Sequence, residues 1–306
     1  MFLISYQTIF IDAKLLSVKY FNSKIVKWPQ ESGVYFLSLP FDGATSIGKG
    51  ASGAPQAISQ YSEKISPYDH LRLRSVSDFN LFSLELEKGF FKSHIEIVNS
   101  AGTQIDKLDL NKQSLITIGG DHSVIRYSVE KYLKSYEDLV VIQLDAHADM
   151  IADFLGDTNS HGSIMQNILN MFGEKHELIQ YGVRQVKPSE HQKMNHLGSL
   201  SETLEELLEK LRTIPGDRPV YLTVDCDFFD PSCLPGTGAP CPGGASYNDF
   251  KSIVEILIEK NIVGADLVEL APSLDTSEVS VSLASFILRD LTLLIGTNLE
   301  GKKLNS

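Results

Sequence analysis

Six short apolar runs, separated by amphipathic stretches, constrain the fold of this chain more than any other feature of its sequence. The runs are rich in Val, Ile, Leu or Tyr and show little alternation of apolar and polar residues, as expected for strands covered on both faces. The stretches between them have helical periodicity. Strands that alternate with helices predict a parallel sheet with helices on both faces. The predicted strands are residues 34–39, 115–118, 139–144, 178–183, 220–224 and 263–270, and the predicted helices are residues 127–136, 164–172, 203–211, 247–260 and 280–294.

We expect residues 1–306 to form a single α/β domain, because the sequence shows no internal repeat, no low-complexity tract and no linker. Residues 1–33 precede the first predicted strand and form an N-terminal extension. The polar residues 297–306 form a C-terminal tail that we expect to fray, as unpacked chain ends do.

The charge of the chain argues against one class of partner. Lysine and arginine number 27, and aspartate and glutamate 39, which gives a formal net charge of −12 at pH 7. Proteins that bind nucleic acid need a basic surface, so we expect no nucleic-acid partner. Acidic clefts attract cations, and a small cationic substrate is compatible with this composition.

The sequence predicts neither a membrane span nor a disulfide framework. The most apolar late stretch, residues 283–295, contains Arg289 and Asp290, and the N-terminal residues lack the basic region of a signal peptide. The three cysteines, at positions 226, 233 and 241, are an odd number and lie close together. Such a set is typical of a reducing compartment, so we predict a cytoplasmic protein without a membrane partner.

Acidic side chains and imidazoles gather where three of the predicted strands end. Binding sites in parallel α/β sheets form at the carboxyl ends of strands. In an extended chain, residues two apart point to the same side, so we expect two of these groups to converge while Cys226 points the other way into the core. The groups are Asp121 with His122, then Asp145, His147 and Asp149, and finally Asp225 with Asp227.

Four of these carboxylates beside an apolar sheet would repel one another and lose hydration, so they must take up protons or bind cations. Two divalent cations match the charge of four aspartates, and two imidazoles complete the coordination. Oxygen and imidazole ligands favour a hard ion such as Mn²⁺, although zinc, cobalt and nickel are also compatible. Paired cations lower the pKa of a shared water, which predicts a binuclear metallohydrolase. Separate, solvated loop acids are the simpler alternative.

Several motifs, in the same order along the chain, resemble the ureohydrolase family of arginases and agmatinases. The resemblance extends over residues 34–295. One departure is the loop at residues 48–59, where Ser59 stands at a position in which the family commonly has arginine. The motifs are Leu39-Pro40-Phe41-Asp42-Gly43, Gly119-Gly120-Asp121-His122-Ser123, Asp145-Ala146-His147-Ala148-Asp149, Ser160-His161-Gly162, Asp225-Cys226-Asp227, Pro235-Gly236-Thr237-Gly238 and Asp266-Leu267-Val268-Glu269.

This resemblance implies an arginase-like three-layer αβα fold with a mostly parallel eight-stranded sheet and two Mn²⁺ ions per subunit. It also implies hydrolysis of a guanidino group to urea and an amine, and a homo-oligomer that is a trimer or a hexamer. His161 matches the active-site histidine of the family, and Glu269 matches the acid that pairs with the guanidinium. The implied ligands of one ion are His122, Asp145, Asp149 and Asp225, and those of the other are His147, Asp145, Asp225 and Asp227.

We predict catalytic roles for three residues. Glu269 would orient the guanidinium through charge-assisted hydrogen bonds. Asp149 would ligate metal and accept a hydrogen bond from the attacking water. His161 would pass a proton to the leaving amine, because its ordinary pKa of about 6.5 suits that transfer. Asp121 is expected to orient the site or to cap the following helix, and Asp266 to be an acid at a strand end.

The loop before His161 favours agmatine as the substrate, which would yield putrescine and urea in polyamine biosynthesis. Arginases resemble this chain in the metal motifs but carry an asparagine where Ile151 stands here. Asp153 and Asp157 add negative charge, which would repel a substrate carboxylate and attract a second cationic group.

Other activities stay open at this point. Asn159 and Ser160 could bind a substrate carboxylate from the far end of the loop. Guanidinobutyrase, arginase and formimidoylglutamase activities are therefore the alternatives to agmatinase. A non-catalytic scaffold, with the cleft blocked by residues 48–59, is an alternative of a different class.

Overall fold

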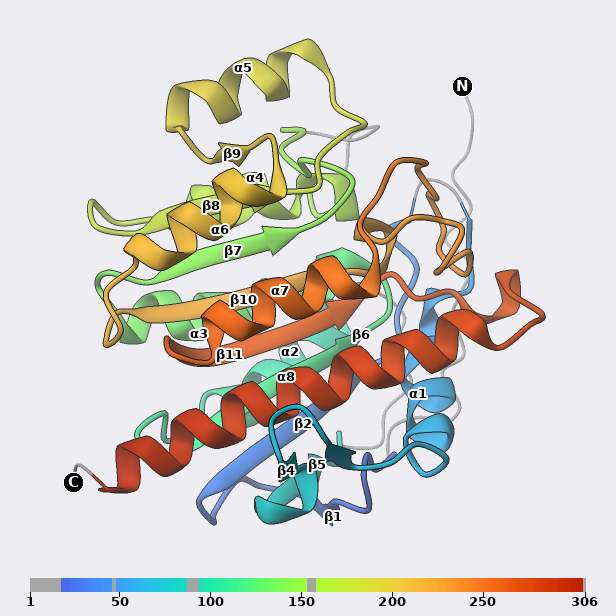
Figure 1. Ribbon diagram of the computed structural model, residues 1–306, viewed down its shortest axis with the longest axis vertical. Helices are drawn as coiled ribbons and strands as arrows, with labels where there is room; N and C mark the ends of the chain where they lie inside the picture. Colours follow the sequence, from blue (N-terminus) through green and yellow to red (C-terminus); the bar gives the residue numbers. More distant parts are fainter. Residues whose placement is uncertain (1–17, 46–47, 87–93, 153–157, 305–306) are drawn as a thin grey trace.

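The computed structural model describes residues 18–45, 48–86, 94–152 and 158–304, and these form a central nine-stranded sheet (Figure 1). The strand order is β1-β5-β2-β6-β11-β10-β7-β8-β9, and every pairing within it is parallel. Two further short strands, β3 (Tyr68–Asp69) and β4 (Arg74–Ser75), form an antiparallel pair. The strands of the main sheet are β1 (Lys24–Val26), β2 (Gly33–Leu39), β5 (Leu81–Leu84), β6 (Gln113–Gly119), β7 (Val140–Leu144), β8 (Glu177–Tyr181), β9 (Leu200–Ser201), β10 (Pro219–Asp225) and β11 (Asn261–Val268).

Helices cover both faces of the sheet, because successive strand residues point to opposite sides. Val34 and Phe36 of β2 belong to one hydrophobic cluster, and Tyr35 and Leu37 belong to the other. The first cluster includes residues of α1, α6, α7 and α8, and the second includes residues of α2, α3 and α4. Figure 1 shows α6, α7 and α8 in front of the sheet and α2 and α3 behind it. The helices are α1 (Ala54–Ser62), α2 (His94–Ile105), α3 (Arg126–Ser135), α4 (Ile164–Leu169), α5 (Pro188–Leu197), α6 (Leu204–Thr213), α7 (Tyr247–Leu257) and α8 (Val279–Leu304).

The predicted three-layer αβα fold is confirmed, but the sheet has nine strands instead of eight. All six predicted strands are present. β1, β5 and β9 were not predicted from the sequence, because they have only three, four and two residues and are too short for a periodic signal. β1 lies inside the stretch 1–33 that was expected to be an extension, and it pairs with β5 at one edge of the sheet.

Helix α8 is longer than predicted and passes through the core. It continues beyond residue 294 to Leu304, so the residues from 297 onward that are described belong to a helix. Part of it, Val279–Gly301, is apolar and long enough to cross a membrane, but 78% of its most apolar stretch is buried inside the protein, as in a core helix. Its buried Asp290 accepts a hydrogen bond of 2.7 Å from the Tyr247 hydroxyl and lies 3.3 Å from the Arg289 guanidinium.

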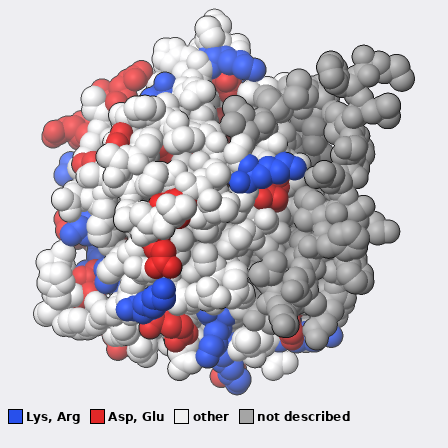
Figure 2. All heavy atoms as spheres, turned by 90° about the vertical axis from the view of Figure 1, so that its right-hand side faces the viewer, with Lys and Arg blue, Asp and Glu red and all other residues white. Residues whose placement is uncertain are grey.

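The register of the central strands brings their carboxyl ends to one edge of the sheet. Val224 of β10 lies beside Leu144 of β7, and Asp225 lies beside Val268 of β11. In Figure 1 these ends face the right-hand side of the molecule. Figure 2 looks onto this side and shows lysine and arginine side chains interspersed with aspartate and glutamate on its described part. The segments that follow β6, β7, β10 and β11 therefore meet at the same place.

Gly264 offers a test of how tightly the sheet packs against α3. A Cβ atom at this position would lie 2.5 Å from Cζ of Tyr132. The Tyr132 hydroxyl is held in place because it accepts a hydrogen bond of 3.0 Å from the Leu115 amide. We predict that Gly264→Ala lowers the free energy of unfolding by about 1–3 kcal/mol, as overpacking does. Urea denaturation measures the loss. Gly301→Ala in α8 is the control, since nothing lies within 4 Å of its Cβ, and equal stabilities of the two variants would contradict the prediction.

Candidate metal centre and active site

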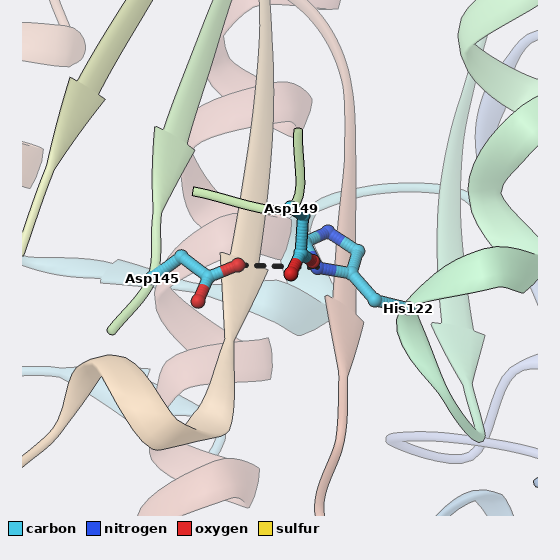
Figure 3. A group of neighbouring side chains, drawn as sticks. All are labelled: His122, Asp145 and Asp149. Atoms are coloured by element: carbon cyan, nitrogen blue, oxygen red, sulfur yellow. Dashed lines mark ion pairs between the residues drawn. The ribbon is translucent and has the colours of Figure 1, made fainter. Parts of the chain in front are cut away.

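Three carboxylates surround the imidazole of His122, which follows β6. Its Nδ1 lies 3.2 Å from Oδ2 of Asp145, 3.0 Å from Oδ2 of Asp149 and 3.4 Å from Oδ2 of Asp225. Figure 3 shows the side chains of His122, Asp145 and Asp149 pointing toward one another, His122 from the segment after β6 and the two aspartates from the segment after β7. These three residues offer ligand atoms that all lie within 4.8 Å of one another, a spacing that could hold a metal ion.

A second group of the same kind lies next to the first. Nδ1 of His147 is 3.0 Å from Oδ2 of Asp227 and 3.6 Å from Oδ1 of Asp145. Asp145, His147 and Asp227 also offer ligand atoms within 4.8 Å of one another. Asp145 belongs to both groups, so the arrangement could hold two neighbouring cations bridged by this carboxylate.

The hydrogen bonds of His122 fit a metal ligand. Its Nδ1 is buried and has no hydrogen-bond partner, although three carboxylates surround it. Its Nε2 lies 2.8 Å from Oγ1 of Thr223, which in turn donates a hydrogen bond of 2.7 Å to Oδ1 of Asp266. Because the hydroxyl proton of Thr223 goes to Asp266, the hydroxyl oxygen accepts the Nε2 proton of His122. Nδ1 is therefore the ring nitrogen that faces the carboxylates, and it could ligate a cation once its proton is displaced, as in metal-ligating histidines oriented by a hydrogen bond.

The pKa values of these side chains show the effect of burying several carboxylates together. Burial, with the charge of Asp145, raises the pKa of Asp149 to about 6. Burial and the charges of Asp227 and Asp145 raise the pKa of Asp225 well above its ordinary value. Burial alone would lower the pKa of His147, but hydrogen bonds to Asp145 and Asp227 raise it to about 12. Burial alone would raise the pKa of Asp145, but hydrogen bonds to His122 and His147 instead lower it. Divalent cations can replace the protons that Asp149, Asp225 and His147 retain.

The acids converge because the chain turns after β7 and β10. The prediction that these segments are extended is therefore wrong. Oδ1 of Asp145 accepts a hydrogen bond of 2.6 Å from the His147 amide, and Oδ1 of Asp225 accepts one of 2.8 Å from the Asp227 amide. These bonds curl the chain, and residues Cys226–Phe228 form a turn of 3₁₀ helix. Asp149 has a positive φ of 52°. Cys226 is buried in the core, as expected.

Glu269 links the metal-ligand candidates to His161. Its backbone has a positive φ of 62°, and its amide donates a hydrogen bond of 2.8 Å to the Gly120 carbonyl. Its Oε1 lies 2.9 Å from the His122 amide and 3.1 Å from Nδ1 of His161. Positive φ at Glu269 is uncommon for such a residue, and such strained positions concentrate at functional sites.

Asp121 holds the backbone next to His122 in place through hydrogen bonds. Its carboxylate accepts hydrogen bonds from the Ala44 amide at 2.9 Å and from the Ser123 amide at 3.1 Å. It therefore caps the 3₁₀ turn His122–Ile125 and ties it to the segment after β2, whereas the helix at Arg126 has no side-chain cap. Burial and the charge of Glu269 raise the pKa of Asp121 to about 7.

A pocket of about 410 Å³ opens over both ligand groups. Among its lining residues are His147, Asp149, Asp225 and Asp227, together with Glu269 and His161. Its rim is formed by the segment after β8 and the start of α5, by Ile151, and by two small residues after β10. The lining residues are His147, Ala148, Asp149, Ile151, His161, Gly162, Gln185, Val186, Lys187, Glu190, Asp225, Asp227, Gly238, Ala239 and Glu269.

Two residues at the rim of the pocket, Lys187 and Glu190, were not predicted from the sequence. Lys187 is exposed and is the only lysine or arginine among the described residues that line the pocket. Glu190 is buried, and its carboxylate accepts hydrogen bonds of 3.1 Å from the Met150 amide and 3.2 Å from the Lys187 amide. The one signal in the sequence was their position after a predicted strand end, at residues 178–183.

Other residues expected near the substrate lie elsewhere. Oδ1 of Asn159 accepts a hydrogen bond of 2.7 Å from Arg126, and the Ser160 hydroxyl lies 3.0 Å from the hydroxyl of Ser163. Neither residue lines the pocket. Asp153 and Asp157 lie outside the described residues.

The unusual loop at residues 48–59 forms a short 3₁₀ turn, Ala51–Gly53, and most of α1. Oδ2 of Asp42 accepts hydrogen bonds of 2.9 Å from the Gly50 amide and 3.0 Å from the Ser52 hydroxyl. None of the described residues of this loop lines the pocket, so the described part of it does not block the site as the scaffold alternative required.

Comparisons with known proteins agree with this fold and site. The family model of the arginase family matches residues 32–294. The chain is 30% identical to the agmatinase of Bacillus subtilis over 285 residues, which are 90% of this chain and 96% of that protein. It is 31% identical to the agmatinase of Bacillus cereus over 275 residues, covering 86% of this chain and 92% of that protein. The solved structure of proclavaminate amidino hydrolase from Streptomyces clavuligerus has a TM-score of 0.82 at 25% identity, covering 92% of this chain and 97% of that one.

A parallel sheet with paired histidine and carboxylate groups at its carboxyl edge defines an α/β protein with a binuclear type of metal site. The chain belongs to the arginase family. That family consists of binuclear metal enzymes, and the chain is a hydrolase acting on guanidino compounds.

The contact between Glu269 and His161 generates a prediction about proton affinity. Burial alone would lower the pKa of His161, but the hydrogen bond and charge of Glu269 raise it to about 9. We predict that Glu269→Gln removes this charge and lowers the pKa of His161 from about 9 toward its ordinary value, because burial then opposes only the remaining charges of Asp149 and Asp121. Titration of the His161 ring signals by NMR in metal-free protein measures the change. Thr103→Val, on the exposed face of α2, is the control, and a pKa of about 9 in both variants would contradict the assignment.

Proposed function

We propose that this chain hydrolyses agmatine to putrescine and urea at a centre of two Mn²⁺ ions. The observation that carries the proposal is the pair of histidine–carboxylate groups sharing Asp145 in a pocket that also exposes Glu269 and His161. An acyclic guanidinium fits a pocket of about 410 Å³ with a carboxylate at its inner wall.

The proposed ligands are the six residues predicted from the sequence. His122 and Asp149 would hold one cation and His147 and Asp227 the other, with Asp145 and Asp225 between them. The two carboxylate oxygens of Asp225 face the two groups. Oδ2 lies 3.4 Å from Nδ1 of His122, and Oδ1 accepts a hydrogen bond from the Asp227 amide, which supports the bridging role. Bound cations would supply Lewis-acid activation of a water molecule and electrostatic stabilisation of the oxygen that adds to the guanidino carbon.

The remaining steps belong to side chains of the chain itself. Glu269 accepts hydrogen bonds from the guanidinium and holds it over the ligand groups. The carboxylate of Asp149 accepts a hydrogen bond from the attacking water and fixes its direction. The imidazole of His161, whose pKa is raised to about 9, holds a proton at neutral pH and passes it to the leaving amine.

Agmatine is favoured over L-arginine by the chemistry of the rim. Ile151 lines the pocket with an apolar side chain and offers no hydrogen bond to a substrate carboxylate. Glu190 adds a carboxylate that would attract a cationic tail. Both Bacillus relatives are agmatinases, which supports the same choice.

Lys187 favours a second candidate substrate class. It places a positive charge at the rim, where the tail of a bound guanidino compound would lie. A linear guanidino acid such as 4-guanidinobutyrate could pair its carboxylate with this ammonium group. Guanidinobutyrase activity is therefore the alternative that the rim supports, and formimidoylglutamase activity would need the same contact.

A substrate panel tests the proposal. We predict that the Mn²⁺-loaded enzyme releases urea from agmatine with a kcat/KM at least about 100-fold above that for L-arginine, because a carboxylate beside Ile151 loses its hydrogen bonds. Urea release from agmatine, L-arginine and 4-guanidinobutyrate is measured under one metal-saturated condition. Asp225→Asn is the inactive control, since it removes a proposed bridging ligand and is expected to lose bound metal.

The panel also decides between the two candidates. A preference for 4-guanidinobutyrate would overturn the agmatine assignment, and Lys187→Glu would then shift the preference back toward agmatine. Release of urea from none of the three compounds would contradict the proposed function as a whole.

The proton transfer assigned to His161 generates a separate prediction. We predict that His161→Asn lowers kcat by about 10²–10⁴-fold, the usual contribution of general acid–base catalysis, with KM less affected. Both metal ions should remain bound, as measured by elemental analysis of the purified variant. Loss of metal from this variant would show that His161 is a ligand and not the proton donor.

The cytoplasmic location and the trimeric or hexameric assembly stay predictions. The three cysteines are free in the structure, which supports a reducing compartment.

A further inference from the structure

Arg184 connects the two chain segments that carry the second ligand group. Its amide donates a hydrogen bond of 2.9 Å to the carbonyl of Ala146, the residue between Asp145 and His147. Its guanidinium donates one of 2.7 Å, through Nη2, to the main-chain carbonyl of Asp227. The Ala146 amide in turn donates a hydrogen bond of 3.1 Å to Oδ1 of Asp227. One residue thus contacts both sides of the Asp145, His147 and Asp227 group.

The guanidinium of Arg184 is bound by main-chain carbonyls alone within the described contacts. Nη1 donates to Gly182 at 2.9 Å, and Nη2 and Nε donate to Cys241 at 2.8 and 3.1 Å. Longer contacts reach the carbonyls of Phe228 at 3.3 Å and Phe229 at 3.5 Å. Only an arginine offers enough donors in a fixed plane for such a set, since a lysine has three donors on one nitrogen.

The surroundings leave little room for rearrangement. A Cβ atom at Gly244 would lie 2.6 Å from Nη2 of Arg184, so the loop before α7 closes over the guanidinium. The ring of Phe228 packs edge-on against Tyr181, with centroids 5.7 Å apart, and the turn that carries Asp227 is held between these rings and Arg184.

We propose that Arg184 is a positioning residue for the cation held by Asp145, His147 and Asp227, and not for the cation beside His122 and Asp149. The inference rests on the proposed metal centre. Ligands must be held to within about 0.5 Å, and loss of the guanidinium frees the Asp227 turn to move relative to His147. The described contacts of Arg184 reach neither His122 nor Asp149, so the first site should keep its geometry.

The test is a Mn²⁺ titration of metal-free protein by calorimetry, with Arg184→Met compared with wild type. We expect two binding steps in the wild type. In the variant, the affinity of one step should fall by about 10–100-fold, the usual effect of losing a residue that orients metal ligands, while the other step changes less than about twofold. Metal affinity is the readout, so the result does not depend on activity.

Arg218 provides a matched control. Its guanidinium also donates to main-chain carbonyls, those of Asp138 at 2.9 Å and Lys175 at 3.1 Å, and it pairs with Glu177. It precedes β10, at the opposite end of that strand from Asp225. Arg218→Met should therefore lower stability without changing either Mn²⁺ affinity.

A double-mutant cycle with Asp227→Asn tests whether Arg184 acts through Asp227. If it does, adding Arg184→Met to Asp227→Asn should lower the affinity of the weakened step by much less than it does in wild type. Arg184→Lys, which retains the charge and fewer donors, should give an intermediate and equally selective loss, and it decides the matter where Arg184→Met does not fold.

Equal losses at both steps, or unchanged affinity at both, would overturn the positioning role. A wild-type protein that binds no Mn²⁺ would instead refute the proposed metal centre on which the inference rests.

Discussion

Mutual repulsion among buried carboxylates is the constraint on which this site depends. Asp145, Asp225 and Asp227 are almost fully buried, and Asp149 is only 8% exposed. Such a group of acids is costly in an apolar interior unless cations or protons neutralise it. The two imidazoles supply part of this compensation when no cation is bound, because the pKa of both rings, which burial alone would lower, is raised by the neighbouring carboxylates. Divalent cations can neutralise the same carboxylates. Metal binding by these residues is therefore expected to stabilise the folded protein.

This arrangement requires a strained backbone at a few positions. Asp149 and Glu269 both have positive φ, which is unfavourable for residues with a side chain. The strain is offset by hydrogen bonds to the same segments: the Asp149 carbonyl accepts from the amide of Met165 at 3.0 Å, and the Glu269 amide donates to Gly120 at 2.8 Å. Because the supports come from neighbouring elements, the side chains are oriented before a substrate enters.

The sequence predicted the layers and the convergence of the proposed ligands, because both follow from patterns with a fixed physical meaning. Apolar runs such as residues 220–224, bounded by turn residues and alternating with helical stretches, are typical of strands covered on both faces, and the carboxyl ends of parallel strands lie at one edge of the sheet. Local geometry could not be predicted. Whether Asp225 continues the strand or turns depends on its own hydrogen bond to the Asp227 amide, which a spacing rule does not contain. The link from His122 through Thr223 to Asp266 joins the turn after β6 to β10 and β11, and predicting it would have required the register of the sheet.

The residues proposed to carry out the reaction and those proposed to select the substrate belong to different elements, but the two sets are linked by hydrogen bonds. The ligand groups and Glu269 follow the central strands, whereas Lys187 and Glu190 belong to the start of α5. Such a division lets the rim change while the reacting centre is kept. Glu190, however, accepts hydrogen bonds from both Met150 and Lys187. Met150 follows Asp149 directly, so a change at Glu190 that alters the rim also releases the backbone next to a proposed metal ligand. Lys187 contributes only its amide to this link, and its side chain can therefore vary the charge of the rim without moving the metal centre.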